Sequence, residues 1–358
     1  MRKKVLVIIM MFLILSIDAV EALSLSCRSC ILMDIDSGRV LYEKDATTPR
    51  LIASITKIMT AILAIESNKL DDTVIVGDEV LSMYGSNIYI ELGEKIKLED
   101  LVYGLMLRSG NDAAIVIATY IGGTEEKFVD MMNKKAKEIG MKNTIFNNSH
   151  GLDEITQNKS TAYDMALLSS YASNNKTYMK IVGTKKYSVK TNKKTYIWNN
   201  RNNLLFTYEY LTGGKTGYTP NAGKTLVTTA SKKQLNLTAV ALNDGNHYET
   251  HKTLYEYGFN NYKKYKILDK KNFKIDKGYY KNKIYIKNNF YYPLTEYETD
   301  KIKVLAKITK LENYKDNEKI GTAEVYLNND LIHNEPIYVK KENKDNFIDK
   351  IKRLLHIK

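Results

Sequence analysis

The feature that most constrains this chain is a serine that opens an apolar helical run and is followed three residues later by a lysine. Ser54 and Lys57 lead directly into the apolar residues 58–65. Three residues make nearly one helical turn, so the two side chains share a face and can touch. A serine hydroxyl is a weak nucleophile until a base removes its proton. A lysine can be that base only when it is neutral, which requires desolvation or a second cation nearby.

By itself this spacing also fits a helix N-terminus with a surface lysine, but two further motifs favour chemistry. Ser109-Gly110-Asn111 follows a helical pattern over residues 98–107, and Lys215-Thr216-Gly217 lies in the glycine-rich residues 212–218. The order S-x-x-K, S-x-N, K-T-G resembles the motif set of serine acyl-transfer enzymes that act on D-Ala-D-Ala peptides and β-lactams. Three motifs in this order are far more specific than any one of them.

Across residues 31–259 the chain resembles the low-molecular-weight penicillin-binding proteins, and most of all their D-alanyl-D-alanine carboxypeptidases. The stretches 36–42, 109–114, 161–166 and 213–219 carry this resemblance beyond the three motifs. It implies an α+β fold of the β-lactamase/transpeptidase type, in which helices flank an antiparallel sheet and the cleft lies at the edge of the sheet. The enzyme would trim peptidoglycan stem pentapeptides, bind β-lactam antibiotics covalently, and need no metal or other cofactor.

The resemblance also implies roles for the residues of the first two motifs. Ser54 attacks the carbonyl between the last two D-alanines and forms an acyl-enzyme, while Lys57 takes its proton. Ser109 passes a proton to the leaving amine, and Asn111 binds the peptide backbone of the substrate.

The third motif would bind the end of the substrate. Lys215 supplies a positive charge that helps keep Lys57 neutral and attracts the terminal carboxylate, which Thr216 also binds. Gly217 lets the substrate lie against the strand. The backbone N–H groups of Ser54 and Tyr218 are expected to hold the oxyanion.

The histidines show one departure from the family pattern, and they argue against one class of hydrolase. Many members of the family carry an arginine shortly after the last sheet strand that helps bind the carboxylate, and in this sequence its position falls on His247. His247 either substitutes for it or leaves the task to Lys215 and Thr216. The five histidines are scattered and lack a G-x-S-x-G partner, which disfavours a Ser-His-Asp hydrolase. His150 is expected to be structural.

Charge and cysteine content narrow the possible partners and metal sites. The net charge is +13, and the excess is spread along the chain. We find no zinc-finger, helix-turn-helix or RNA-binding motif, so nucleic acid is not an expected partner. Cys27 and Cys30 are the only cysteines, which excludes a four-thiolate zinc site within one chain. They are expected to be a pair of thiols or a small disulfide.

The domain organisation follows from composition. A basic start and a short apolar core predict a signal peptide over residues 1–22. The protein is therefore expected to be exported and to lie at the outer face of the membrane or in the wall. The alternative for residues 1–22 is an uncleaved membrane anchor. The catalytic domain is expected over 23–260 and a small β-sandwich-like domain over 261–341. Residues 342–358 form a basic amphipathic pattern that predicts a helix on an anionic membrane surface, or one docked on the β domain.

Two other functions remain open from sequence alone. A β-lactamase of the S-x-x-K class uses a glutamate to activate the deacylating water, and we find no E-x-x-L-N stretch here. A catalytically silent wall-binding module would carry the same motifs but would form no covalent adduct with penicillin.

Overall fold

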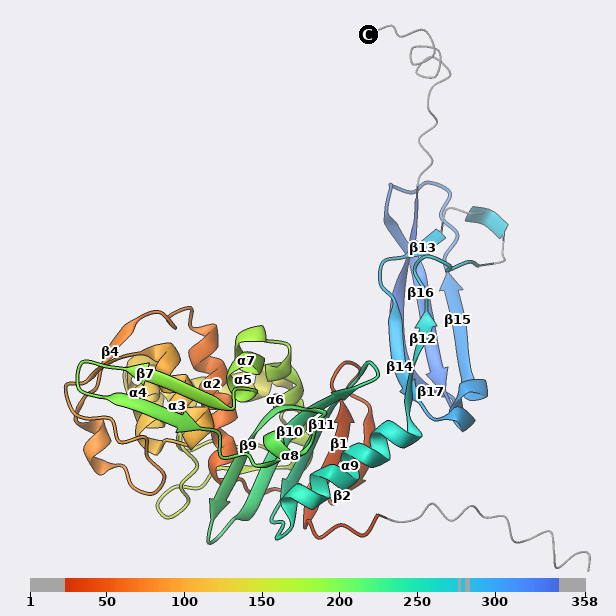
Figure 1. Cartoon of the computed structure of the whole chain (residues 1–358). Coiled ribbons are helices and arrows are strands. Elements are labelled where there is room, and N and C mark those ends of the chain that lie inside the picture. Colours follow the sequence, from red (N-terminus) through yellow and green to blue (C-terminus); the bar gives the residue numbers. More distant parts are fainter. Residues whose placement is uncertain (1–22, 276–277, 281–283, 341–358) are drawn as a thin grey trace, which may run out of the picture.

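The computed structural model describes residues 23–275, 278–280 and 284–340. The predicted signal peptide (1–22) and amphipathic helix (342–358) lie outside the described residues. The described part of the chain has no helix that is both long and apolar enough to cross a membrane. The architecture is α+β, with a helix-flanked antiparallel sheet followed by an all-β region (Figure 1).

A five-stranded antiparallel sheet forms the frame of the first region. The alternating residues 31–43, with a turn at Ser37-Gly38, predict a hairpin, which the structure confirms as the first two strands. The K-T-G motif lies on an edge strand. The sheet order is β2-β1-β11-β10-β9, with β1 (Ser29–Asp34), β2 (Val40–Lys44), β9 (Leu211–Thr219), β10 (Gly223–Lys232) and β11 (Leu235–Leu242).

Alternating residues of the central strand β11 bury both faces of this sheet. Val240 and Leu242 join the core on the side of helix α6, whereas Leu237 and Ala239 join the core under helix α9. A strand buried on both faces reads as a continuous apolar run, as β11 does. The helices are α2 (Lys57–Glu66), α3 (Leu98–Arg108), α4 (Asn111–Gly122), α5 (Glu125–Ile139), α6 (Ala162–Ser173), α7 (Lys176–Val182), α8 (Leu204–Thr207) and α9 (His247–Asn261).

Short hairpins and bridges complete the helical side. The only tryptophan, Trp198, is buried there and stacks with Tyr187, so its role is in packing. The minor strand pairs are β3 (Arg50–Leu51) with β6 (Lys159–Ser160), β4 (Thr73–Ile75) with β5 (Lys95–Lys97), and β7 (Lys186–Lys190) with β8 (Thr195–Asn199); the 3₁₀ turns are η1 (Ala53–Thr56) and η2 (Asp78–Ser82).

The second region is all-β, as its alternating pattern predicts. A two-stranded and a four-stranded sheet share a small core around Ile286, Val325 and Ile337. The strands are β12 (Lys263–Leu268) with β14 (Phe290–Leu294), and, in the order β13-β17-β16-β15, β13 (Ile284–Ile286), β17 (Asp330–Val339), β16 (Glu318–Leu327) and β15 (Ile302–Ile308); the 3₁₀ turns are η3 (Gly278–Tyr280) and η4 (Glu296–Lys301).

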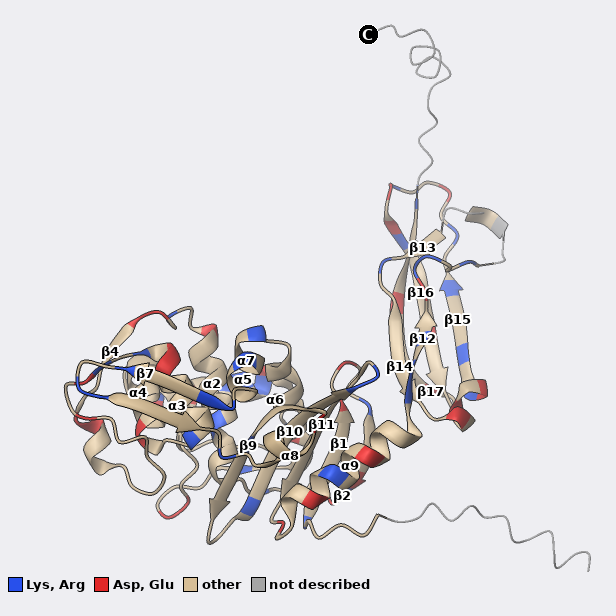
Figure 2. Cartoon of the chain, in the orientation of Figure 1, with Lys and Arg blue, Asp and Glu red and all other residues tan. Residues whose placement is uncertain are grey.

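Arg39, in the β1–β2 turn, joins the two regions. Its guanidinium forms an ion pair with Glu298 and donates to the carbonyl of Pro293. It also lies 5.2 Å and 5.1 Å from the ring centroids of Tyr262 and Tyr292. Lysine and arginine occur on both regions, interspersed with acidic residues (Figure 2).

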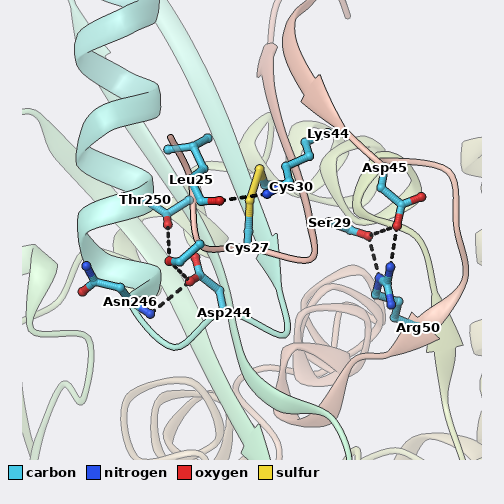
Figure 3. Close-up of a disulfide and its surroundings, with 11 residues drawn as sticks. Leu25, Cys27, Ser29, Cys30, Lys44, Asp45, Arg50, Asp244, Asn246 and Thr250 are labelled. Atoms are coloured by element: carbon cyan, nitrogen blue, oxygen red, sulfur yellow. Dashed lines mark hydrogen bonds and ion pairs between the residues drawn. A yellow bond between two sulfur atoms is a disulfide. The ribbon is translucent and has the colours of Figure 1, made fainter. Parts of the chain in front are cut away.

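The two cysteines form a disulfide that ties the N-terminal segment to strand β1 (Figure 3). Both residues are buried, at 1% and 0% exposure. Beside them, the Ser26 hydroxyl donates to Asp244 Oδ1, which also accepts from the backbone N–H of Asn246 just before α9. Of the two states predicted for the pair, the structure has the disulfide.

Candidate active site

Ser54 lies in η1, immediately before α2, and not in the first α-turn that its spacing suggests. The preceding residue, Ala53, has a left-handed backbone with φ of 49°. A neighbouring loop fits tightly here, because a Cβ on Gly151 would lie 2.0 Å from the Ala53 carbonyl oxygen. This close approach requires glycine and holds the loop that contains His150 against the serine turn.

The Lys57 amine is fully buried and lies 3.1 Å from Ser54 Oγ. It also donates to Asn111 Oδ1 at 2.7 Å and to the His150 carbonyl at 2.5 Å. Asn111 Nδ2 donates to the carbonyl of Tyr84, which orients Oδ1 toward the lysine. A neutral amine has two hydrogens and one lone pair. The two acceptors take both hydrogens, and the lone pair is left for the hydroxyl proton of Ser54.

The S-x-N motif forms the reversal between two helices. Ser109 ends α3 with a left-handed φ of 64°, and Asn111 begins α4. This turn brings both side chains to the same place, where each contacts a lysine of another motif. Ser109 Oγ accepts from Lys215 Nζ at 3.0 Å, as Asn111 accepts from Lys57.

Strand β9 brings the K-T-G motif against the serine turn. A Cβ on Gly217 would lie 3.0 Å from the backbone nitrogen of Ser54, and 2.4 Å from Thr225 Oγ1 on the neighbouring strand. Only a glycine permits this approach of β9 to η1. Lys215 is buried at 1% exposure, and its amine also donates to the Thr216 carbonyl at 2.6 Å.

Burial and neighbouring cations set the charges of the two lysines. Desolvation holds the pKa of Lys57 well below its usual value, and the positive charges of Lys215 and Arg201 lower it further. Desolvation and Arg201 lower the pKa of Lys215 to about 7. These effects favour the neutral form of the Lys57 amine, and the Lys215 amine, with a pKa of about 7, is partly charged at neutral pH. An anionic group next to Lys215 would raise its pKa and favour the charged form.

Tyr218 and His247 lie at the margin of this arrangement. The Tyr218 side chain is 64% exposed on β9 and pairs in register with Lys224. His247 is the first residue of α9 and is mostly buried, with no hydrogen bond to the three motifs among the described residues. Its Nδ1 has no partner there, and burial and Lys224 lower its pKa. Its predicted part in carboxylate binding stays a prediction.

Two contributions were missed by the sequence reasoning. Arg201 lowers the pKa of both lysines, yet it lies in an asparagine-rich loop whose sequence carries no motif. His150 acts through its backbone carbonyl, which no side-chain pattern reveals. Its ring accepts from the Leu152 N–H, and burial lowers the pKa of the imidazole to about 3. Within residues 23–275, 278–280 and 284–340 no cluster of His, Cys, Asp or Glu could hold a metal ion.

Family comparisons agree with this geometry. Residues 17–246 match the model of the peptidase S11 family, described as D-alanyl-D-alanine carboxypeptidase. The chain belongs to this family. Residues 260–345 match the model of the C-terminal domain of penicillin-binding protein 5. The predicted family is confirmed, and both matched regions correspond to the parts of the fold described above.

Curated relatives include D-alanyl-D-alanine carboxypeptidases of two bacteria. DacF of Bacillus subtilis is 39% identical over 221 residues, which cover 60% of this chain and 56% of the relative. DacC of Escherichia coli is 37% identical over 242 residues, which cover 63% of this chain and 58% of the relative. The matches therefore span somewhat more than half the length of these relatives.

Solved structures of the family match more of the chain. Penicillin-binding protein 5 of Haemophilus influenzae superposes with a TM-score of 0.75 at 25% identity, covering 89% of this chain and 98% of that one. The carboxypeptidase DacD of Francisella tularensis superposes with a TM-score of 0.69 at 26% identity, covering 89% of this chain and 94% of that one. These matches confirm the predicted fold, including the C-terminal β region.

Proposed function

We propose that this protein is a serine-type D-Ala-D-Ala carboxypeptidase that removes the terminal D-alanine from peptidoglycan stem pentapeptides. The observation that carries the proposal is the buried amine of Lys57, whose two hydrogens are taken by Asn111 and His150 and whose lone pair remains for Ser54. The names of the family and of its relatives support the same activity.

In the proposed reaction the two D-alanine residues are separated through an acyl-enzyme. Ser54 Oγ bonds to the carbonyl carbon of the penultimate D-alanine, and its proton passes to Lys57. The backbone N–H groups of Ser54 and Tyr218 bind the oxyanion; a lost oxyanion donor costs about 3 kcal/mol of barrier. The C–N bond then breaks, and the leaving amine takes a proton through Ser109. Water adds to the acyl carbonyl, and the Ser54–acyl bond breaks to free the serine.

Substrate selection in this proposal depends on the terminal carboxylate. Lys215 and Thr216 bind it at the edge strand, with Asn111 on the backbone of the peptide and His247 as a further candidate contact. The partly protonated amine of Lys215 fits this role, because the carboxylate would favour its charged form. β-Lactam antibiotics present a strained amide and a carboxylate in the same relation, so they would acylate Ser54.

The location of the protein is also part of the proposal. The signal peptide predicted for residues 1–22 would export the chain, and the basic residues 342–358 would bind an anionic membrane surface. The domain limits of 23–260 and 261–341 are supported by the helix α9, which ends at Asn261, and by strand β12, which starts at Lys263. The active site would then face the wall.

Two measurements test the proposal. Incubation with a D-Ala-D-Ala peptide should release D-alanine, and the Ser54→Ala variant should release none. Intact-mass spectrometry after penicillin treatment should show one long-lived adduct on the wild type. Rapid turnover of penicillin would indicate a β-lactamase, and the absence of any adduct would indicate a silent wall-binding module; either result contradicts the proposal.

A further inference from the structure

A second concave surface lies between the two regions, away from the three motifs. This groove has a volume of about 890 Å³, within the range of ligand sites in proteins. It is lined by helix α9, by Tyr208 just after α8, by Leu23, and by the start of the turn η4 in the β region. A ligand in the groove would contact both regions.

Three tyrosines line the groove, and two of them are held by side-chain contacts. Tyr208 donates to Glu256 at 2.7 Å and stacks on Tyr255, while Tyr257 packs edge-on against Tyr42. Tyr297 is 84% exposed. Aromatic side chains supply a large apolar face with a polar tip, which suits ligands that have both kinds of surface.

The backbone that carries Tyr297 is fixed although its ring is exposed. The turn η4 has a capping box between Thr295 and Glu298, and Glu298 is paired with Arg39 of the other region. A tyrosine has only two side-chain torsions, so it loses little conformational entropy when it binds. Tyr297 therefore presents an exposed ring on a fixed backbone.

The charge of the groove disfavours strongly anionic ligands. Among the described residues that line it are Glu249, Glu256 and Glu296 and one cation, Lys252, which pairs with Glu249 at 3.7 Å. The groove is thus acidic in a chain of net charge +13. Phosphate-rich wall polymers and anionic lipid headgroups would be repelled. A ligand rich in hydroxyl and amide groups would find acceptors and donors in the carboxylates, in Asn260 and in Thr253.

We propose that this groove binds the sugar backbone of peptidoglycan, a strand of N-acetylated amino sugars. The apolar faces of the sugar rings would pack on the tyrosines, and the hydroxyl and acetamido groups would bond with the polar side chains. The choice of this polymer rests on the proposed function. Binding the strand at a second site keeps its stem peptides at a high local concentration near Ser54.

Calorimetric titration of the full chain with a β-1,4-linked N-acetylglucosamine tetramer tests the groove without any stem peptide. The tetramer should bind the wild type and Ser54→Ala equally. The variants Tyr297→Ala and Thr253→Trp, which remove a contact and fill the groove, should bind at least tenfold more weakly. Tyr291→Ala is the matched control, because Tyr291 is also exposed on the β region and lies outside the groove.

A second assay links the groove to activity. Tyr297→Ala should release D-alanine several-fold more slowly from intact wall fragments, and at the wild-type rate from a short soluble peptide. The proposal is overturned if the tetramer does not bind the wild type, or binds all variants alike, or if sugar-free stem peptide competes for the groove. Failure of the proposed activity would appear instead as no release from the soluble peptide, whether or not the tetramer binds.

Discussion

The Gly217→Ala substitution tests whether the contact between strand β9 and the serine turn is what builds the oxyanion site. The added methyl group would lie 2.4 Å from Thr225 Oγ1 and 3.0 Å from the Ser54 backbone nitrogen, whereas ordinary contact begins near 3.4 Å. Relief requires a shift of about 0.4 Å from the Ser54 nitrogen and about 1 Å from Thr225 Oγ1, which would lengthen the hydrogen bonds that the two proposed backbone donors make to the oxyanion. Loss of one such donor typically lowers the rate by about 100-fold or more.

The assay is the second-order rate of acylation by a fluorescent penicillin, with thermal unfolding measured in parallel. Gly245→Ala is the matched control, because its added Cβ meets nothing within 4 Å. Adding Thr225→Ala should restore only part of the rate, since it removes the 2.4 Å contact but not the one with Ser54. Wild-type acylation by a stably folded Gly217→Ala protein would refute the reasoning.

Three further outcomes follow from the site and the disulfide. Arg201→Gln removes a cation that lowers the pKa of Lys57, so the acidic limb of the pH profile of acylation should shift to higher pH, and Arg201→Lys should restore it. Since Lys215 loses its charge above about pH 7, KM for a peptide carboxylate should rise with pH between 7 and 9, and KM for the amidated peptide should not. Replacing Cys27 and Cys30 by serine should lower the free energy of unfolding by about 2 kcal/mol, measured by urea titration, and leave acylation unchanged.

Local patterns in the sequence predicted most of the elements. The pattern over residues 125–139 predicts a helix, and α5 has these bounds. Thr161 is a predicted helix cap, and it caps α6 by accepting from the Asp164 N–H. Helix α7 (Lys176–Val182) was missed, because seven residues are too few for a periodic pattern. The sequence pattern predicts a helix over residues 250–257 only, whereas α9 begins at His247 and ends at Asn261.

The sequence predicts which motif residues form the candidate active site. It does not predict the neighbouring groups that set the pKa values and hydrogen bonds of the two lysines. The order and spacing of the three motifs predict that Lys57, Asn111 and Lys215 lie in one site, and the structure brings their side chains together. Arg201 and the carbonyl of His150 come from loops whose positions depend on tertiary packing. Side-chain periodicity carries no information about either one.

The neutral state of Lys57 can be tested through stability alone, without a substrate. An unfolded lysine keeps its proton up to about pH 10.4, whereas burial lowers the pKa of the folded Lys57 well below that value. Between these two pKa values the unfolded state binds one more proton, so the stability of the wild type should rise as the pH approaches 10, by up to about 1.4 kcal/mol per pH unit.

Lys57→Met lacks this proton, and comparison with it removes the contribution of the other titrating groups. Methionine leaves Asn111 Oδ1 and the His150 carbonyl without a donor. This loss lowers the free energy of unfolding of the variant by a constant amount and adds no pH dependence. The free energies of unfolding, from urea titrations at several pH values, should therefore diverge as the pH rises, with the wild type gaining. Parallel curves would mean that the folded Lys57 is as protonated as the unfolded one, and the buried amine could not then be the base that activates Ser54.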